Sequence, residues 1–163
     1  MSIYTNLFRK IDVADLDRLY DLKINSQNFT NSLFLKNKTE QAQWFESLKN
    51  NQRELALIYQ KNNEDVGFYY IRDIDWISRN HNFSYYIYEQ YREKGNGFKM
   101  LSDAIDYSFY TLNMNKIYGE VLSNNLASIH IIKKCGFKIL CSKKNHCYKN
   151  GKYYDSLYFE LEK

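Results

Sequence analysis

Apolar residues along the chain gather in short runs separated by polar clusters, with longer periodic stretches between some of them. Runs rich in β-branched and aromatic residues predict strands, here at Ile3–Arg9, Leu55–Tyr59, Val66–Ile74, Phe83–Tyr88, Lys116–Leu122, Phe137–Ser142 and Tyr154–Leu161. Helices are expected at Val13–Leu22, Glu40–Lys49, Gly97–Leu112 and Leu126–Lys134. Asp12 is the expected N-cap of the first helix, and Thr39 of the second.

This order of elements predicts an α+β fold, in which about four helices flank a mixed, mostly antiparallel sheet of seven strands. The polar segment Lys61–Asp65 is typical of a hairpin turn. No linker-like stretch, repeat or long charge block interrupts the 163 residues, so we expect a single domain over residues 1–163.

Composition narrows the class of partner. Hydrophobic residues make up 44% and charged residues 26%, as in ordinary soluble proteins. The 16 Tyr and 10 Phe are unusually many, and aromatic surfaces can stack nucleic-acid bases. The tyrosines are spread along the chain, however, and a net charge of +4 is mild. We therefore expect no nucleic-acid partner, whereas a small polyanionic ligand suits the charge.

Targeting signals and metal motifs are also missing from the sequence pattern. The first ten residues lack the basic and apolar segments of a signal peptide, and no run approaches the roughly 18 apolar residues of a membrane span. Cys135, Cys141 and Cys147 lie six apart, unlike the closer pairs of zinc sites. We expect a cytoplasmic protein with reduced thiols, no metal and no membrane contact.

Two of the six glycines lie one residue apart in Tyr91–Phe98. A glycine-rich turn between apolar runs can be a hairpin, or it can bind phosphate through its backbone. The apolar residues that follow are spaced three or four apart, as on one face of a helix: Phe98, Leu101, Ile105, Phe109 and Leu112. The stretch therefore joins a strand to a helix N-terminus, whose unpaired N–H groups suit an anion.

Two motifs in this chain resemble those of the GNAT acetyltransferase superfamily. Arg92–Gly97 has the form R-x-x-G-x-G and is similar to the loop that binds the pyrophosphate of acetyl-CoA. Asn125–Ser128, followed by Lys134–Phe137, is similar to the superfamily's N-x-x-S…K-x-G-F segment. The residues agree with this reading, because Asn125 occupies an N-cap position and Gly136 the position after a helix. The resemblance implies the GNAT fold.

Further segments indicate one branch of that superfamily. Trp44–Phe45, Tyr85–Ile87 and Lys149–Asp155 resemble the branch that holds the ribosomal-protein, spermidine and amino-sugar acetyltransferases. Lys116–Leu122 and Lys149–Asp155 are most similar to enzymes that acetylate nucleotide-linked amino sugars of the pseudaminic-acid type. It implies acetyl transfer from acetyl-CoA to a primary amine of such a small molecule.

Other acceptors of the acetyl group, and a function of a different class, are alternatives. A polyamine site needs acidic residues, and the early helices and caps carry Asp12, Asp15, Asp17, Asp21, Glu40 and Glu46. A protein N-terminal amine is another acceptor of the same chemistry. A module that binds CoA without catalysis is the alternative from a different class, with a tyrosine-rich RNA binder third. A homodimer is also an open alternative.

The resemblance implies where the cofactor binds. Backbone N–H groups of the glycine loop would face the pyrophosphate, a strand edge would pair with the pantetheine amides, and two downstream residues would lie along the pantetheine arm. The implied set is Ile87, Tyr88, Arg92, Glu93, Lys94, Gly95, Asn96, Gly97, Asn125 and Ser128.

For the base we favour Glu120, where some superfamily members carry a catalytic glutamate, provided that burial raises its pKa toward neutral. An ion-paired glutamate on the sheet is the alternative. His81, expected on a solvated loop, and His130 are weaker candidates. The superfamily's usual acid, a tyrosine, is replaced by Ile132, which cannot donate a proton.

Ser128, Tyr86 or Tyr153 could take over as acid, or the thiolate could leave without one, because thiols ionise near pH ~8.5. The acceptor site is expected at the two early helices and the loop Asn25–Lys38, whose amides and aromatic residues suit a sugar. A surface loop would have the same composition.

Overall fold

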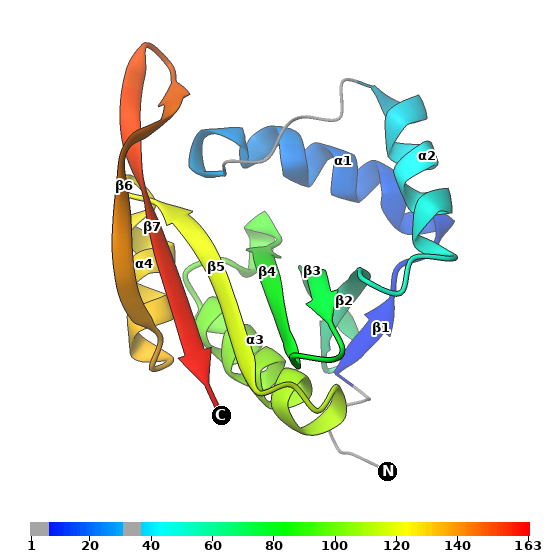
Figure 1. The fold of residues 1–163 in the computed structure, drawn as a ribbon. Helices are drawn as coiled ribbons and strands as arrows, with labels where there is room; N and C mark the ends of the chain where they lie inside the picture. Colours follow the sequence, from blue (N-terminus) through cyan, green and yellow to red (C-terminus); the bar gives the residue numbers. More distant parts are fainter. Residues whose placement is uncertain (1–6, 31–36) are drawn as a thin grey trace.

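The computed structural model describes residues 7–30 and 37–163. These residues form a seven-stranded sheet in the order β1-β2-β3-β4-β5-β7-β6 (Figure 1). All neighbouring strands are antiparallel except β4 and β5, which run parallel. The strands are β1 (Phe8–Lys10), β2 (Leu55–Lys61), β3 (Glu64–Asp75), β4 (Asn80–Ile87), β5 (Lys116–Leu122), β6 (Lys138–Lys149) and β7 (Lys152–Glu162). The expected α+β fold is confirmed.

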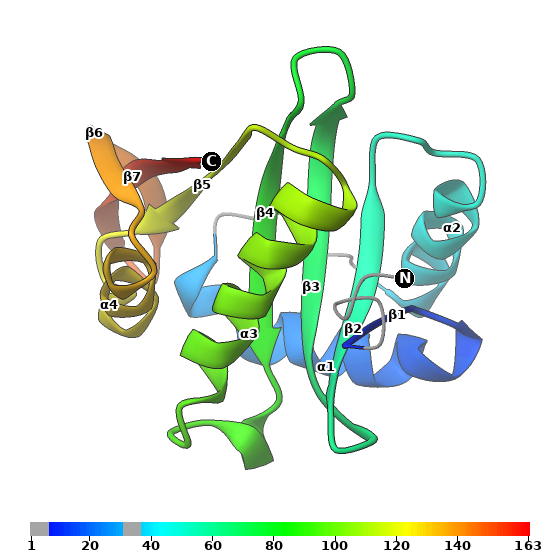
Figure 2. The same cartoon turned by 90° about the horizontal axis from the view of Figure 1, so that it is seen from below.

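Helices cover both faces of the sheet (Figure 2). They are α1 (Leu16–Asn25), α2 (Lys38–Leu48), α3 (Asn96–Asp106) and α4 (Leu126–Lys134). On one face, α3 and α4 bury the larger apolar cluster, which includes Met100, Leu101 and Ile132. On the other, α1 packs Leu19 and Leu22 against the sheet, with α2 beside it. Successive side chains of a strand point to opposite faces of the sheet, so neighbouring residues face different helix pairs.

The parallel pair β4–β5 is the feature that opens the sheet. Its register joins Asn80–Asn82 to Lys116–Tyr118 and goes no further, although both strands continue. Figure 1 shows the two strands diverging from this point toward their C-terminal ends. Backbone groups on the facing edges beyond Asn82 and Tyr118 are thus left for another partner.

Several local predictions are confirmed. Asp12 caps the first helical turn, where its carboxylate accepts from the Ala14 N–H at 2.8 Å. The hairpin between β2 and β3 turns at Asn62 and Asn63, whose φ angles of 53° and 63° are those of a tight turn.

Other boundaries differ from the sequence prediction. Asn37, not Thr39, caps α2, and its side chain accepts from the Glu40 N–H at 2.9 Å. The third helix ends early as an α-helix, because Tyr107–Thr111 form a π-helical segment. The expected first strand is described from Phe8 onward, and its beginning lies outside the described residues.

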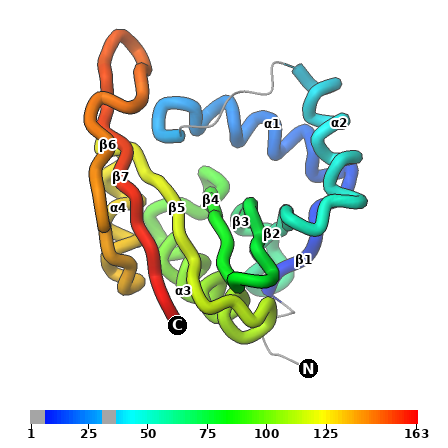
Figure 3. Tube along the Cα trace, viewed as in Figure 1, coloured from blue at the N-terminus to red at the C-terminus, as the bar shows by residue number. Residues whose placement is uncertain are grey.

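The last two strands are longer than predicted. β6 runs to Lys149 and β7 begins at Lys152, so the pair forms an extended hairpin that reaches past β5 (Figure 3). Its turn contacts the end of the first helical segment, where Asn150 donates to the side chain of Asn28 at 2.9 Å. This contact joins the edge of the sheet to the face covered by α1.

A group of ion pairs ties the N-terminal segment to the sheet. Arg9 binds Asp15 at 2.7 Å and Asp65 at 2.6 Å, and Arg18 binds the same two carboxylates. Burial opposes ionisation of Asp15 and Asp65, but hydrogen bonds, chiefly from Arg9, outweigh it and lower the pKa of both. The short strand β1, the start of α1 and β3 are thereby held together.

We predict that Asp15→Asn lowers the free energy of unfolding by about 3 kcal/mol, because it removes a buried carboxylate from the group and leaves Arg9 and Arg18 to share Asp65. Urea unfolding at neutral pH measures the loss. Asp17→Asn, which removes an exposed pair with Lys38, is the control and should leave stability nearly unchanged, because solvent screens such a pair. Equal losses in both variants would contradict the prediction.

The same carboxylates predict a pH dependence. Their pKa values are lower in the folded chain than in the unfolded one, so their stabilisation is complete above the unfolded value of about 4. It is lost as the pH falls from there toward the folded pKa. Asp15→Asn should therefore show a shallower loss of stability below pH ~4 than the wild type.

Candidate functional site

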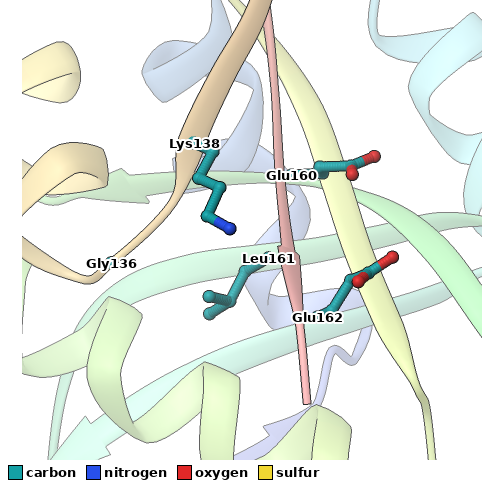
Figure 4. Close-up of a pocket in the computed structure, with 5 residues that line it drawn as sticks. All are labelled: Gly136, Lys138, Glu160, Leu161 and Glu162. Atoms are coloured by element: carbon teal, nitrogen blue, oxygen red, sulfur yellow. The ribbon is translucent and has the colours of Figure 1, made fainter.

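A groove with a volume of about 930 Å³ opens where β4 and β5 separate. Its walls come from β3, β4, the loop before α3, β5, α4 and β7, and the end of α1 closes one side. Ligand pockets in proteins are usually of this size. A second hollow of about 100 Å³ beside Lys138 and Leu161 has room for a few waters at most (Figure 4). The large groove is the candidate site.

The glycine loop forms one end of the groove. Gly95 has φ of +73°, a conformation that side chains with a Cβ rarely adopt. A Cβ on Gly97 would lie 2.9 Å from the Ile131 side chain, so this glycine lets α3 pack closely on α4. Lys99 makes the first hydrogen bond within α3, to the carbonyl of Gly95. The preceding N–H groups have no partner inside the helix and suit an anion.

Most residues of the expected cofactor set line this groove: Ile87, Arg92, Glu93, Gly95, Gly97, Asn125 and Ser128. Tyr88 does not. It is buried beneath α1, and its N–H already donates to the Val66 carbonyl at 3.0 Å. Its carbonyl accepts from the Tyr91 N–H, so the predicted strand-like pairing of Tyr88 with a ligand is wrong. The Ile87 carbonyl accepts from the Arg92 Nε at 3.2 Å, and pairing of the Ile87 N–H with a ligand stays a prediction.

Lys94 and Asn96 also lie outside the groove lining. The Lys94 ammonium donates to the Gln90 carbonyl at 2.9 Å. The buried Asn96 side-chain amide donates to the Tyr91 carbonyl at 2.9 Å. This hydrogen bond stabilises the loop before α3 from within the fold. The Lys94 side chain, expected to add charge at the pyrophosphate, is bonded within the loop instead, and the expected contact of the Asn96 backbone N–H stays a prediction.

Asn125 makes two hydrogen bonds at the opposite end of the groove. Its side-chain oxygen accepts from the Ser128 N–H at 3.2 Å, as predicted for an N-cap. Its amide nitrogen donates to the Phe29 carbonyl at 3.4 Å, and neighbouring Asn124 donates to the Asn28 carbonyl at 3.2 Å. Both asparagines thus hold the 3₁₀ turn Gln27–Phe29, which follows α1, over the groove. Of the expected acceptor loop, residues 31–36 lie outside the described residues.

Glu120 lines the groove from β5, but it is an ion-paired carboxylate. Lys143 donates to one oxygen, and Ser156 donates to the other at 2.7 Å. Burial alone would raise the pKa of Glu120, but these hydrogen bonds outweigh it and lower the pKa. The expectation of a pKa raised toward neutral is wrong, because two donors stabilise the charged form.

His81 is not a candidate base. It is fully buried among the groups packed against α3, with Nε2 at 2.9 Å from the Ser108 hydroxyl. Burial lowers the pKa of His81 to about 4, so the ring is neutral at neutral pH. It does not line the groove, whereas His130 does. The interpretation of His81 as a solvated loop histidine is also wrong.

Sequence reasoning missed four further groove residues. The Arg72 Nε, Asn82 Oδ1, Tyr85 hydroxyl and Asn124 Oδ1 atoms are buried and have no hydrogen-bond partner among the described residues. Such groups cost about 1–3 kcal/mol each when left unpaired, so they mark where a polar ligand belongs. The alternation of side chains along β3 and β4 could have placed two of these residues on the same face, because Arg72 and Asn82 are paired across the two strands.

Residues 7–30 and 37–163 contain neither a helix that could span a membrane nor a cluster of side chains that could hold a metal ion. No helix there is both long and apolar enough to span a bilayer. No three His, Cys, Asp or Glu side chains there lie close enough together to hold a metal ion.

Comparison with known proteins gives a consistent result. A family model described as an acetyltransferase (GNAT) domain matches residues 7–138. The spermidine N(1)-acetyltransferase of Vibrio cholerae is 28% identical over 134 residues, which cover 73% of this chain and 78% of that protein. The corresponding enzyme of Escherichia coli K12 is 28% identical over 106 residues, or 65% of this chain and 57% of that protein.

The fold is shared with a solved structure. The crystal structure of spermidine N-acetyltransferase from Vibrio cholerae, in complex with CoA and spermine, superposes with a TM-score of 0.89. The match covers 95% of this chain and 94% of that one, at 22% sequence identity. At this identity, the likeness establishes the fold.

We predict that acetyl-CoA stabilises the protein by about 3 kcal/mol at a hundredfold excess over Kd. Gly95→Ala should weaken binding about tenfold, because strain at positive φ distorts the anion-binding loop. Thermal melting with and without acetyl-CoA measures both effects.

Gly151→Ala is the matched control. Gly151 has φ of +78°, and a Cβ added to it, like one added to Gly95, would meet no atom within 4 Å. It lies in the turn between β6 and β7 and does not line the groove. It should lose similar stability but keep its affinity for acetyl-CoA. Equal affinity losses in the two variants would exclude the loop as the binding site.

Proposed function

The chain belongs to the acetyltransferase (GNAT) domain family, and on this basis we propose that its groove catalyses acetyl transfer from acetyl-CoA to a primary amine of a polyamine. The chain is an N-acetyltransferase with acetyl-CoA as the donor. The choice of a polyamine rests on one observation, the similarity to two curated spermidine N(1)-acetyltransferases.

The loop before α3 is the proposed site of the pyrophosphate. The N–H groups at the start of α3 and the Arg92 side chain, which lines the groove, supply partial and full positive charge. The facing edges of β4 and β5, unpaired beyond Asn82 and Tyr118, offer N–H and C=O groups to the pantetheine amides. The donor would then run from the loop along Ile87 toward the middle of the groove.

The acceptor side is the face of the groove under α1. Glu120 contributes a carboxylate there, and Phe29 and Tyr86 contribute aromatic faces. An ammonium group is attracted both to a carboxylate and to the face of an aromatic ring. These three groups provide one site for one ammonium of a polyamine.

The reaction proceeds by direct attack. The amine nitrogen, once it has lost its ammonium proton, bonds to the thioester carbon, and the C–S bond breaks with its electron pair on sulfur. Since its pKa is lowered, Glu120 is a weak base. We assign it to holding and orienting the ammonium, from which water in the open groove takes the proton.

We predict that Glu120→Gln lowers kcat/KM for the amine about 30-fold, because the neutral amide no longer attracts the ammonium. KM for acetyl-CoA should stay within about twofold. Release of free thiol, measured against amine concentration, gives both values.

The control variant is Glu160→Gln. Glu160 is also a sheet carboxylate paired with a lysine, Lys116 at 3.3 Å, and it does not line the groove. It should keep full activity. Unchanged turnover in Glu120→Gln would remove Glu120 from the site, and an equal loss in both variants would assign it a structural role.

A nucleotide-linked amino sugar is the second candidate acceptor, favoured by the charges in the groove. Among the described lining residues, the carboxylates are Glu93 in the loop and Glu120, already paired. Arg72 places a guanidinium in the same wall, with the amides of Asn82 and Asn124 nearby in the lining. A guanidinium attracts phosphate or carboxylate and repels a polycation.

Arg72→Gln separates the two candidates, because they predict effects of opposite sign. If the acceptor is a polyamine, losing the guanidinium should raise kcat/KM for spermidine by about tenfold. If the acceptor is an anionic amino sugar, the same variant should lower kcat/KM by about tenfold.

The assay compares spermidine, spermine, nucleotide-linked amino sugars and a short peptide with a free N-terminus. Arg79→Gln is the control, since Arg79 contacts Asn113 and lies outside the groove lining. Turnover of the peptide alone would overturn both candidates. Binding of acetyl-CoA without thiol release from any acceptor would identify a non-catalytic module.

A further inference from the structure

Tyr85 carries a hydroxyl that nothing in the fold explains. Its side chain lines the groove from β4 and packs with the cluster on the α3–α4 face, where its ring lies 6.4 Å from that of Phe83. The hydroxyl is buried and has no partner in good hydrogen-bond geometry among the described residues, although the Ser128 side chain interacts with it and lowers its pKa against the effect of burial. A buried donor without a partner costs free energy that a ligand acceptor would recover.

The hydroxyl lies over the inner face of α4. Its electrostatic neighbours are Ser128 and Cys135, which are seven residues apart and so lie on one face of the helix. Ile132 lies between them on that face, lines the groove and offers no donor. Tyr85 therefore brings a phenol from the strand to a part of the wall where the helix is aliphatic.

Strand alternation separates the two halves of the groove. Tyr86 packs with the cluster under α1, on the side assigned above to the acceptor. Tyr85 faces the other way, toward α4. A donor that enters from the loop before α3 and passes Ile87 next meets Tyr85, two residues back along the same edge.

We propose that Tyr85 is a catalytic residue, whose hydroxyl donates a hydrogen bond to the sulfur of CoA as the C–S bond breaks. This inference rests on the proposed acetyl transfer in the same groove. The amine nitrogen bonds to the carbonyl carbon, and sulfur leaves with the electron pair. Negative charge then develops on sulfur, and a donor aimed at it lowers the barrier.

The proton balance follows from acidity. Burial raises the pKa of Tyr85 to about 12, while the Ser128 side chain acts in the opposite direction, so the hydroxyl is protonated at neutral pH. A thiol ionises near pH ~8.5. The phenol is the weaker acid, so it keeps its proton and stabilises the thiolate. The proton that the sulfur finally carries comes from the amine nitrogen, by way of solvent.

Tyr85→Phe removes the hydroxyl and leaves the ring. We expect kcat to fall about 30-fold and KM for acetyl-CoA to change less than about twofold, since the bond forms as charge develops. Tyr107→Phe is the matched control: this tyrosine packs with the same apolar cluster and lies outside the groove lining. It should retain full activity.

A second measurement does not depend on the acceptor. The ionisation of the thiol of bound CoA is followed by the ultraviolet absorbance of the thiolate, with desulfo-CoA as the blank. Loss of the Tyr85 hydroxyl should raise the thiol pKa by about one unit, a tenfold change in its ionisation constant. A side chain that only packs would leave this pKa unchanged.

The outcomes separate this inference from the proposed function. If CoA binds both proteins with the same thiol pKa, Tyr85 is not the donor, although the enzyme is still an acetyltransferase. If CoA does not bind the wild type, the site itself is wrong. Should Tyr85→Phe not fold, a fluorinated tyrosine at position 85 is a stronger donor and should lower the thiol pKa. No change there would also overturn the inference.

Discussion

The separation of β4 from β5 is the constraint on which the site depends. Their parallel pairing stops at Asn82 and Tyr118, while β5 continues its pairing with β7 as far as Leu122. On their other edges, β4 pairs with β3 and β5 pairs with β7. The sheet therefore opens between β4 and β5, while both strands stay fixed by their outer neighbours. Backbone groups along the opening must find partners, and a ligand with its own amides can provide them. Every element of the groove is arranged around this opening.

Each end of the opening is closed by a different kind of interaction. At one end, glycine allows both the positive φ at Gly95 and the close packing of Gly97 on α4, so a helix N-terminus faces the groove. At the other, Asn124 and Asn125 join the 3₁₀ turn Gln27–Phe29 to the turn before α4. The first arrangement suits an anion of fixed geometry. The second leaves a region lined by side chains of several elements, which is the proposed acceptor site.

Charges in the groove illustrate why residue type alone is a poor guide to chemistry. Glu120 was assigned correctly to the groove but not in its electrostatic state, because Lys143 and Ser156 lie on neighbouring strands far along the chain. His81 was expected near the surface, yet it is buried against Ser108 of the π-helical segment. Tyr85 was one aromatic residue among many in the sequence. Its unpaired hydroxyl is visible once strand alternation places it over α4.

The sequence by itself determined the elements, the α+β class, the caps at Asp12 and Asn125, and the glycine-containing loop that begins α3. These features depend on spacing along a few residues, and local hydrogen bonding and helical periodicity set them. The tertiary structure alone decided which of the expected residues reach the groove. Tyr88 ends the predicted strand and Asn96 lies within the predicted motif, but the Tyr88 N–H and the Asn96 side chain are bonded to Val66 and Tyr91. Burial, ionisation and unpaired polar atoms depend on contacts between distant strands and helices, and no local pattern records those contacts.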